Sequence, residues 1–319
     1  MSYLVKIILF VLVLWISLVG LEKLFDIGLK HNQNIKSTYI QNKQINADIL
    51  IHGPCEPLWM ISPKVLDKQT GLKSYNLALS HSDFADNYLH LYFYLKHNKA
   101  PKYLFLYVTP ESMDENYNTF NTYRFAPHLK DSLVDRVVAE CDPDYHQWLA
   151  IPFMKYAYYN QKQNFNALQG YKHLFTKRQL PYFPDGFEPP AKIAWDNHLE
   201  SFIELYPKGY YFKWSYLREK YLRKTIELAQ LHRVKVFLYE SPVLKESLPY
   251  QPNRNPILNK IILLADEYQV DYLLFDQMEI ADSREYFISN LNLNLKGGEI
   301  FTDSLGKYIR QKILLGASK

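Results

Sequence analysis

The stretch Ala47–Pro63, ADILIHGPCEPLWMISP, decides the fold that this sequence predicts. Its apolar residues Ile49–Ile51 are typical of a short buried strand, and the run breaks at Gly53. Glycine permits unusual backbone angles, and the two prolines that follow it hold the turn rigid. Such a turn lies at the carboxyl edge of a sheet, where open α/β sheets bind ligands. The turn presents the thiol of Cys55 as a candidate reactive group; the alternative is a small cysteine buried at the end of a strand.

Strands and helices alternate along the rest of the chain. Four more apolar runs indicate strands, at 73–77, 101–108, 234–239 and 270–275. Apolar residues at helical spacing indicate helices over 83–96, 213–232, 254–268 and 296–315. This alternation predicts an α/β fold with a doubly wound, flavodoxin-like parallel sheet of five strands. Residues from about 112 to 211 lack a strand pattern, which predicts a helical, aromatic-rich insertion that either caps the carboxyl edge or extends the core sideways.

The N-terminal residues predict a membrane anchor. Ile7–Leu21 is an unbroken apolar run, and with Tyr3–Val5 it is just long enough to span a bilayer. No small-residue cleavage site follows, so we expect an uncleaved signal anchor with an exported body; a cleaved signal peptide is the alternative. The predicted organisation is an anchor over residues 1–24, a polar stem over 25–46, and an α/β domain over 47–319 that contains the insertion.

Composition and short motifs exclude several functions. The net charge of +4 is too small to indicate a nucleic-acid partner. The sequence has no CxxC or HExxH pair and no glycine-rich phosphate loop after a strand, so we predict neither a metal nor a cofactor. Two cysteines do not make a disulfide framework, although a single Cys55–Cys141 bridge is an alternative in an oxidising compartment.

Four short motifs occur in a definite order along the chain. They are Gly53-Pro54-Cys55-Glu56 after the first strand, Ser62-Pro63-Lys64-Val65-Leu66 downstream, Tyr75-Asn76-Leu77 at the second strand, and the stretch Tyr286–Gly297 before the last helix. In this order the chain resembles the SGNH/GDSL-type hydrolase superfamily. More narrowly, it is similar to the membrane-anchored, exported branch that works beside membrane-bound O-acyltransferases, such as the proteins of D-alanyl transfer and alginate O-acetylation.

The resemblance implies a catalytic triad whose residues are replaced in this chain. The family's nucleophilic Ser, its acidic Asp and its basic His correspond to Cys55, Ser289 and Asn292. An amide cannot take a proton from the nucleophile, and a hydroxyl orients a base poorly, so a Ser-His-Asp mechanism is not expected. A cysteine thiolate is less demanding, and His81, which follows the second strand, is the candidate base; His52 is a weaker one.

Polar residues at the other strand ends should reach the same edge of the sheet. Asn76 ends the second strand and fits either an oxyanion donor or a turn residue. Two functions follow. The first is a degenerate SGNH-like protein, anchored in the inner membrane with its body on the extracytoplasmic side, that binds an acyl donor, a surface glycan or an acyltransferase partner. The second is an active acyltransferase or esterase that uses Cys55.

Overall fold

The chain divides into two compact units. The structure is a computed structural model that describes residues 2–42, 45–116, 119–159, 162–176, 184–190 and 194–315. One unit, here called the helical unit, groups residues 1–43 with 120–182, and the other, the sheet unit, groups residues 44–119 with 183–319. The helical unit thus joins residues of the predicted anchor and stem to part of the predicted insertion, whose residues 117–118, 160–161, 177–183 and 191–193 lie outside the described residues.

A parallel sheet of five strands forms the centre of the sheet unit. The strands are β1 (Ile49–His52), β2 (Ser74–Asn76), β3 (Tyr103–Tyr107), β4 (Lys235–Glu240) and β5 (Asp271–Leu274). Their order is β2-β1-β3-β4-β5, and every adjacent pair is parallel. This confirms the predicted five-stranded parallel α/β architecture, with each strand inside or within a residue of its predicted range. The order reverses between β1 and β3, and ligands in such sheets bind at the carboxyl ends beside that reversal.

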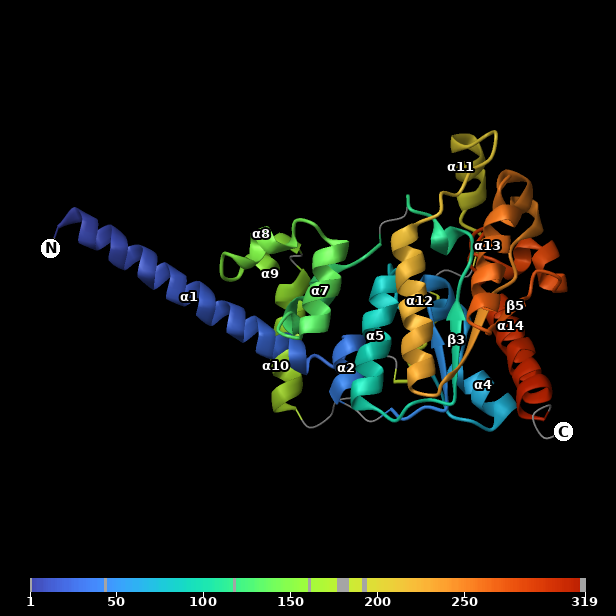
Figure 1. Cartoon of the computed structure of the whole chain (residues 1–319), viewed down its shortest axis with the longest axis horizontal. Coiled ribbons are helices and arrows are strands. Elements are labelled where there is room, and N and C mark those ends of the chain that lie inside the picture. The colour runs from blue at the N-terminus through green and yellow to red at the C-terminus, as the bar shows by residue number, and fades with distance from the viewer. Residues whose placement is uncertain are drawn as a thin grey trace. The chain divides into compact units, whose positions relative to one another are not determined.

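Helices cover both faces of this sheet (Figure 1). The helices of the sheet unit are α3 (Cys55–Met60), α4 (Pro63–Thr70), α5 (Phe84–His97), α11 (His198–Leu205), α12 (Tyr216–Leu231), α13 (Arg254–Glu267) and α14 (Leu295–Tyr308), of which α11 lies beyond the ends of the strands (Figure 1). Helix α5 packs against α12, while α4 packs against α14. The core between the layers is aromatic: Phe105 and Phe237 are fully buried and stack with ring centroids 4.9 Å apart. Residues from β1, β3, β4 and β5 on one face of the sheet belong to one buried apolar cluster, which fixes these strands.

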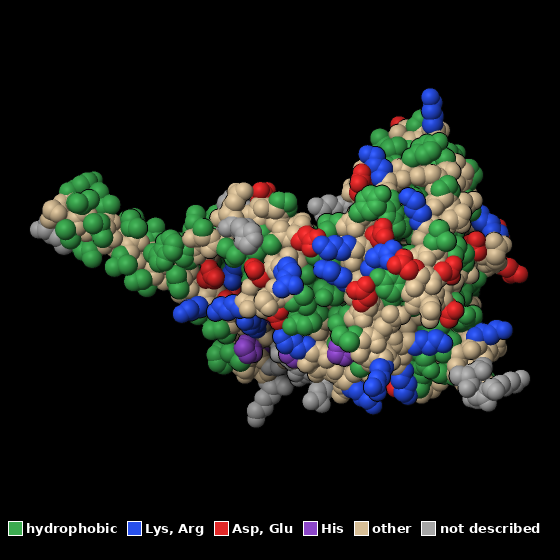
Figure 2. All heavy atoms as spheres, in the orientation of Figure 1, with side chains coloured by type: hydrophobic (Ala, Val, Ile, Leu, Met, Phe, Trp, Pro, Cys, Tyr) green, Lys and Arg blue, Asp and Glu red, His purple; other side chains and the backbone are tan. Residues whose placement is uncertain are grey.

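The helical unit is built around the N-terminal helix α1 (Tyr3–His31). It also contains α2 (Lys36–Asn42), α6 (Thr122–Phe125), α7 (Ser132–Cys141), α8 (Tyr145–Leu149), α9 (Met154–Tyr159) and α10 (Lys162–Phe175). Helix α1 is long and apolar enough to cross a membrane, and its apolar side chains are exposed along most of its length (Figure 2). Whether the insertion caps the sheet stays a prediction.

Candidate functional site

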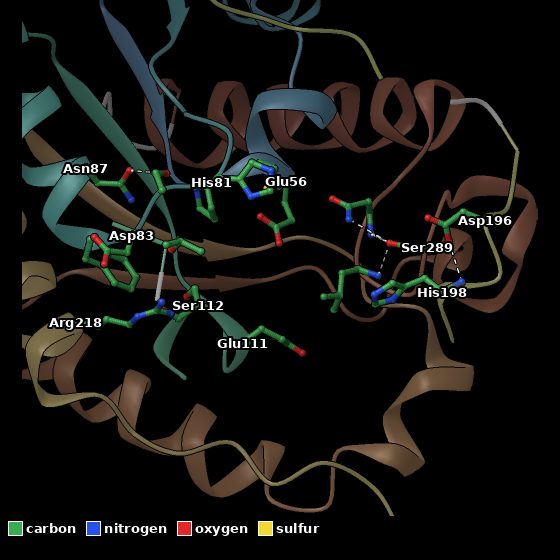
Figure 3. A pocket seen from close by; sticks show the side chains of 17 residues that line it. Glu56, His81, Asp83, Asn87, Glu111, Ser112, Asp196, His198, Arg218 and Ser289 are labelled. Carbon is green, nitrogen blue, oxygen red and sulfur yellow. Dashed lines mark hydrogen bonds between the residues drawn. The ribbon is translucent and has the colours of Figure 1, made fainter. Parts of the chain in front are cut away.

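A pocket of about 300 Å³ lies where the first three strands end. Figure 3 shows its side chains converging from separate segments of the sheet unit. Its lining includes Cys55 and Glu56 after β1, His81 after β2, Glu111 after β3, and Ser289 and Asn292 before α14. Parallel strands bring their carboxyl ends to one edge, so residues more than two hundred positions apart meet there.

The turn after β1 requires a glycine. Gly53 has a φ of +147°, and a Cβ on it would lie 2.7 Å from Cβ of Tyr107 and 2.8 Å from Cγ of Pro57. A residue with a side chain would therefore meet both backbone strain and steric overlap at this position. The turn leads directly into α3, whose first residue is the half-buried Cys55. The thiol is thus placed at the pocket by packing of the turn against β3.

Cys55, Ser289 and Asn292 all line the pocket, and the last two hold a loop together. The Oγ of Ser289 accepts hydrogen bonds from the Asn292 backbone N–H at 3.2 Å and from the Asn292 amide Nδ2 at 3.1 Å. The same Oγ also accepts the Leu291 N–H at 3.4 Å. An amide nitrogen that donates in this way has no lone pair for a proton. Ser289 and Asn292 therefore form a serine-based turn at the pocket wall.

The rest of the motif before α14 also has a structural explanation. Asn294 is the N-cap of α14, and its Oδ1 accepts the Gly297 N–H at 3.0 Å. Its Nδ2 donates to the Glu285 carbonyl at 2.7 Å. A Cβ on Gly297 would lie 2.3 Å from the Tyr286 carbonyl oxygen. The Asn-x-x-Gly spacing thus starts the last helix close to the preceding loop.

Asn76 and His52 are fully buried and make hydrogen bonds to the turns around the pocket. The amide Nδ2 of Asn76 donates to the carbonyls of Pro57 and Ile61, at 2.7 and 2.9 Å, and so holds α3. The Nδ1 of His52 accepts the Gly53 N–H at 3.0 Å, so the proton of the neutral ring is on Nε2, which donates to the Asn87 carbonyl at 2.9 Å. These bonds fit the turn role for Asn76. Neither residue lines the pocket.

His81 lies where the sequence places it, at the pocket beyond β2. Its φ is +48°, a left-handed conformation that non-glycine residues adopt uncommonly, and its side chain is exposed. Figure 3 shows it on the same side of the pocket as Glu56. His81 therefore lies at the pocket as the sequence predicts, and its catalytic role stays a prediction.

A second pocket histidine, His198, was not identified from the sequence. It is the first residue of α11, and its Nδ1 lies 2.9 Å from Oδ1 of Asn290. Because a carboxamide oxygen only accepts, Nδ1 carries a proton and donates it, which leaves the lone pair of a neutral ring on Nε2. Figure 3 shows the His198 ring facing the pocket beside the Ser289 loop. His198 lies in the stretch without strand pattern, so no sequence signal connected it to this edge.

Two acidic side chains also enter the pocket. Figure 3 shows the carboxyl groups of Glu56 and Glu111 directed into its interior. Burial raises the pKa of Glu56 to about 7, and the nearby Glu111 adds to this rise. Burial also raises the pKa of Glu111. One oxygen of each carboxyl group is buried and has no hydrogen-bond partner among the described residues. At neutral pH Glu56 is thus a group that both accepts and donates protons.

One arginine lines the pocket, and a buried ion pair lies at the end of β4. Arg218 of α12 is 6% exposed and lines the pocket; its Nη1 donates to the Ser112 carbonyl at 2.8 Å. At the end of β4, Glu240 and Arg254 form a buried ion pair of 2.7 Å. Within the described part of the chain, no group of three or more His, Cys, Asp or Glu side chains is placed to hold a metal ion. The pocket offers a thiol, two imidazoles and titratable carboxyl groups, which suits a polar ligand rich in hydroxyl groups.

Neither cysteine forms a disulfide: Cys55 and Cys141 are both thiols in the structure. The single bridge considered as an alternative would join the two units and stays a prediction. No family model matches this chain, and no curated protein matches its sequence.

Proposed function

We propose that this chain is a membrane-anchored, extracytoplasmic SGNH-hydrolase-like protein that keeps a ligand pocket without the hydrolytic triad. In this role it assists acylation or handling of a cell-surface polysaccharide by binding the glycan, an acyl donor or a membrane-bound O-acyltransferase. One observation carries the proposal. The positions equivalent to the family's nucleophile, acid and base line one pocket, yet Ser289 and Asn292 hydrogen-bond each other as parts of a turn.

The anchor and the location belong to the same proposal. Helix α1 would hold the protein in the inner membrane with its body on the extracytoplasmic side, close to an acyltransferase that transfers acyl groups there. Its composition supports this, because Tyr3–Leu21 is 19 residues long, is apolar or small at every position except Lys6, and rises about 28 Å as a helix.

A second candidate function is a cysteine acyl transfer, which His198 favours. Its Nδ1 is oriented by Asn290, and it shares the pocket with the half-buried Cys55. In this reaction the Cys55 thiolate attacks an ester carbonyl, the C–O bond breaks, and the alcohol leaves with the proton that the base took from the thiol. A hydroxyl group or water then attacks the thioester and restores the thiol.

Thiol reactivity and ester turnover separate the two functions. The full chain in detergent is treated with iodoacetamide and, separately, with p-nitrophenyl acetate; Cys55→Ala is the test variant and Cys141→Ala the matched control. The proposed function predicts no ester turnover that depends on Cys55. Fast alkylation of Cys55 together with acyl release that Cys55→Ala abolishes and Cys141→Ala retains would replace it with the second function.

A binding measurement tests the pocket itself. Acetylated and deacetylated oligosaccharides are titrated by calorimetry into the full chain and into Leu291→Trp, which fills the pocket. Leu295→Trp is the control, because Leu295 is exposed on the first turn of α14 and does not line the pocket. We expect binding that Leu291→Trp weakens at least tenfold and Leu295→Trp leaves unchanged. Absence of pocket-dependent binding would contradict the glycan as the ligand of the pocket, and absence of Cys55-dependent turnover would contradict the second function.

A further inference from the structure

The apolar run of α1 ends at a defined position along the helix axis. Glu22 is the first acidic residue of the chain, and Asp26 follows one turn later. If residues up to Leu21 fill the hydrocarbon core, the next four or five residues lie at the level of the lipid headgroups, which extend roughly 5–8 Å beyond it. Groups bonded to Glu22 and Asp26 are therefore held at the membrane surface.

The start of α9 is bonded to this part of α1. The Phe153 backbone N–H donates to Oε2 of Glu22 at 2.7 Å. Lys155 is 9% exposed, and its Nζ lies 3.0 Å from Oε1 of Glu22 and 3.1 Å from Oδ1 of Asp26. The Tyr156 hydroxyl also donates to Asp26. Lys155 neutralises one of the two negative charges, and the Phe153 N–H and the Tyr156 hydroxyl hydrogen-bond the carboxylates, so neither carboxylate lacks a partner where the region approaches a bilayer.

A close contact between α1 and α10 fixes the helical unit to α1. A Cβ on Gly170 of α10 would lie 1.6 Å from the Gly28 carbonyl oxygen, and one on Gly28 would lie 2.5 Å from the Ala167 carbonyl oxygen. Only glycine at both positions permits this approach of α1 and α10. The Asn32 amide donates to the Asn166 carbonyl across the same contact, at 2.9 Å. The position of α1 in a membrane therefore sets the height of the whole helical unit.

The turn between α8 and α9 exposes apolar side chains at this level. Leu149 and Ile151 are 42% and 45% exposed, and they precede Phe153, which is bonded to Glu22. Figure 1 shows this turn extending along α1 toward its N-terminal half, beyond the point where α10 crosses. On α1 the neighbouring Leu24 is also exposed, at 52%. Large apolar side chains at such a height are stable in the boundary between headgroups and acyl chains.

We propose that the α8–α9 turn, with Leu149 and Ile151, is seated in the lipid interface beside the end of α1. The partner of this surface is the bilayer itself. This inference rests on the anchored function proposed above and adds a second membrane contact to it. Such a contact fixes the rotation and tilt of the helical unit, which a single helix cannot do by itself.

Spin-label depth measurements on the full chain test the proposal. In a Cys55→Ala/Cys141→Ala background, single cysteines replace Leu149, Ile151, Leu14 or Leu263 and carry a nitroxide; the protein is reconstituted in phosphatidylcholine–phosphatidylglycerol vesicles. Leu14, in the middle of the apolar run, is the hydrocarbon reference. Leu263 of α13, 67% exposed, is the matched aqueous reference. The measured quantity is the ratio of nitroxide collisions with oxygen to collisions with a water-soluble nickel complex.

The expected ratios at positions 149 and 151 lie several-fold above that at 263 and below that at 14. The lipid contact would be overturned if the collision ratios at positions 149 and 151 equalled the ratio at the aqueous reference, position 263. The anchor would remain supported in that case if the ratio at position 14 were that of a label in hydrocarbon. An aqueous value at 14 would instead refute the anchor. Labels at 149 and 151 that reach neither collision partner and show dipolar broadening would mean contact with a second copy, which also overturns the proposal.

Discussion

Replacing Glu56 by Gln should make the stability of the protein less dependent on pH. The side chain enters the pocket, and its Oε2 is buried without a hydrogen-bond partner among the described residues. Burial, with the charge of Glu111 nearby, raises its pKa from 4.5 to about 7. Glutamine has nearly the same shape as the protonated acid and does not ionise, so the variant keeps the neutral form at every pH.

The sign follows from proton binding. The folded state binds this proton more tightly than the unfolded state, so the contribution to stability is fully present below pH 4.5 and is lost as pH rises to about 7. Above pH 7 both states have lost the proton and the difference is constant. A rise of this size corresponds to about 3 kcal/mol between pH 4.5 and pH 8.5. At pH 8.5 the Gln variant should therefore be more stable than the wild type by up to about 3 kcal/mol.

Urea denaturation of the full chain in detergent, at half-unit steps from pH 4.5 to 8.5, measures this difference. The quantity of interest is the free energy of unfolding of the variant minus that of the wild type, since other titrating groups cancel in it. Glu299→Gln is the matched control, because Glu299 is exposed on α14. We expect the Glu56→Gln difference to grow with pH and to level off near pH 7, and the control difference to stay flat.

A flat Glu56→Gln difference would refute the reasoning, because it would mean that the carboxyl group is solvated or paired in the folded protein. A difference that falls with pH would mean that the carboxylate is the stabilised form. The pocket would then be a site for a cationic group rather than for a neutral, hydroxyl-rich ligand.

Three further substitutions, one of them with a matched control, test the packing within each of the two units. Gly53→Ala should destabilise the sheet unit by about 3 kcal/mol, because it adds backbone strain and steric overlap. Gly71→Ala is the control, since Gly71 has a φ of +72° but open space around it, and this substitution should destabilise the unit by about 1 kcal/mol. Thermal melting compares the two variants. Asn76→Ala should cost about 2–4 kcal/mol in urea denaturation because two buried carbonyls lose their donor, and a cost below about 1 kcal/mol would contradict that role. Lys155→Met should destabilise the helical unit by about 2–3 kcal/mol, and unchanged resistance to limited proteolysis would show that Glu22 needs no cationic partner.

Local pattern was sufficient for the architecture of the sheet unit. Buried parallel strands appear as continuous apolar runs, and their helices show apolar residues at a spacing of three and four, so each element carries its own signal. Gly53 was also predictable, because a glycine between an apolar strand and two prolines indicates a turn. The polar candidates Cys55 and His81 followed from their positions directly after strands, since strand ends share one edge.

The rest of the site depended on long-range contacts that no local pattern contains. His198 reaches the pocket from α11 and is oriented by Asn290, 92 residues later in the chain. The pKa of Glu56 depends on how deeply the folded chain buries it, and a carboxyl group in a sequence carries no sign of that.

The sequence by itself determined the parallel α/β architecture and the apolar N-terminal helix, because these follow from periodicity and composition within single segments. Tertiary structure alone decided that Ser289 and Asn292 form a turn, that Asn76 holds α3, and that Phe153 and Lys155 lie against α1. The physical reason is that hydrogen bonds and ion pairs between distant residues depend on the position of both partners, which exists only once the chain has packed.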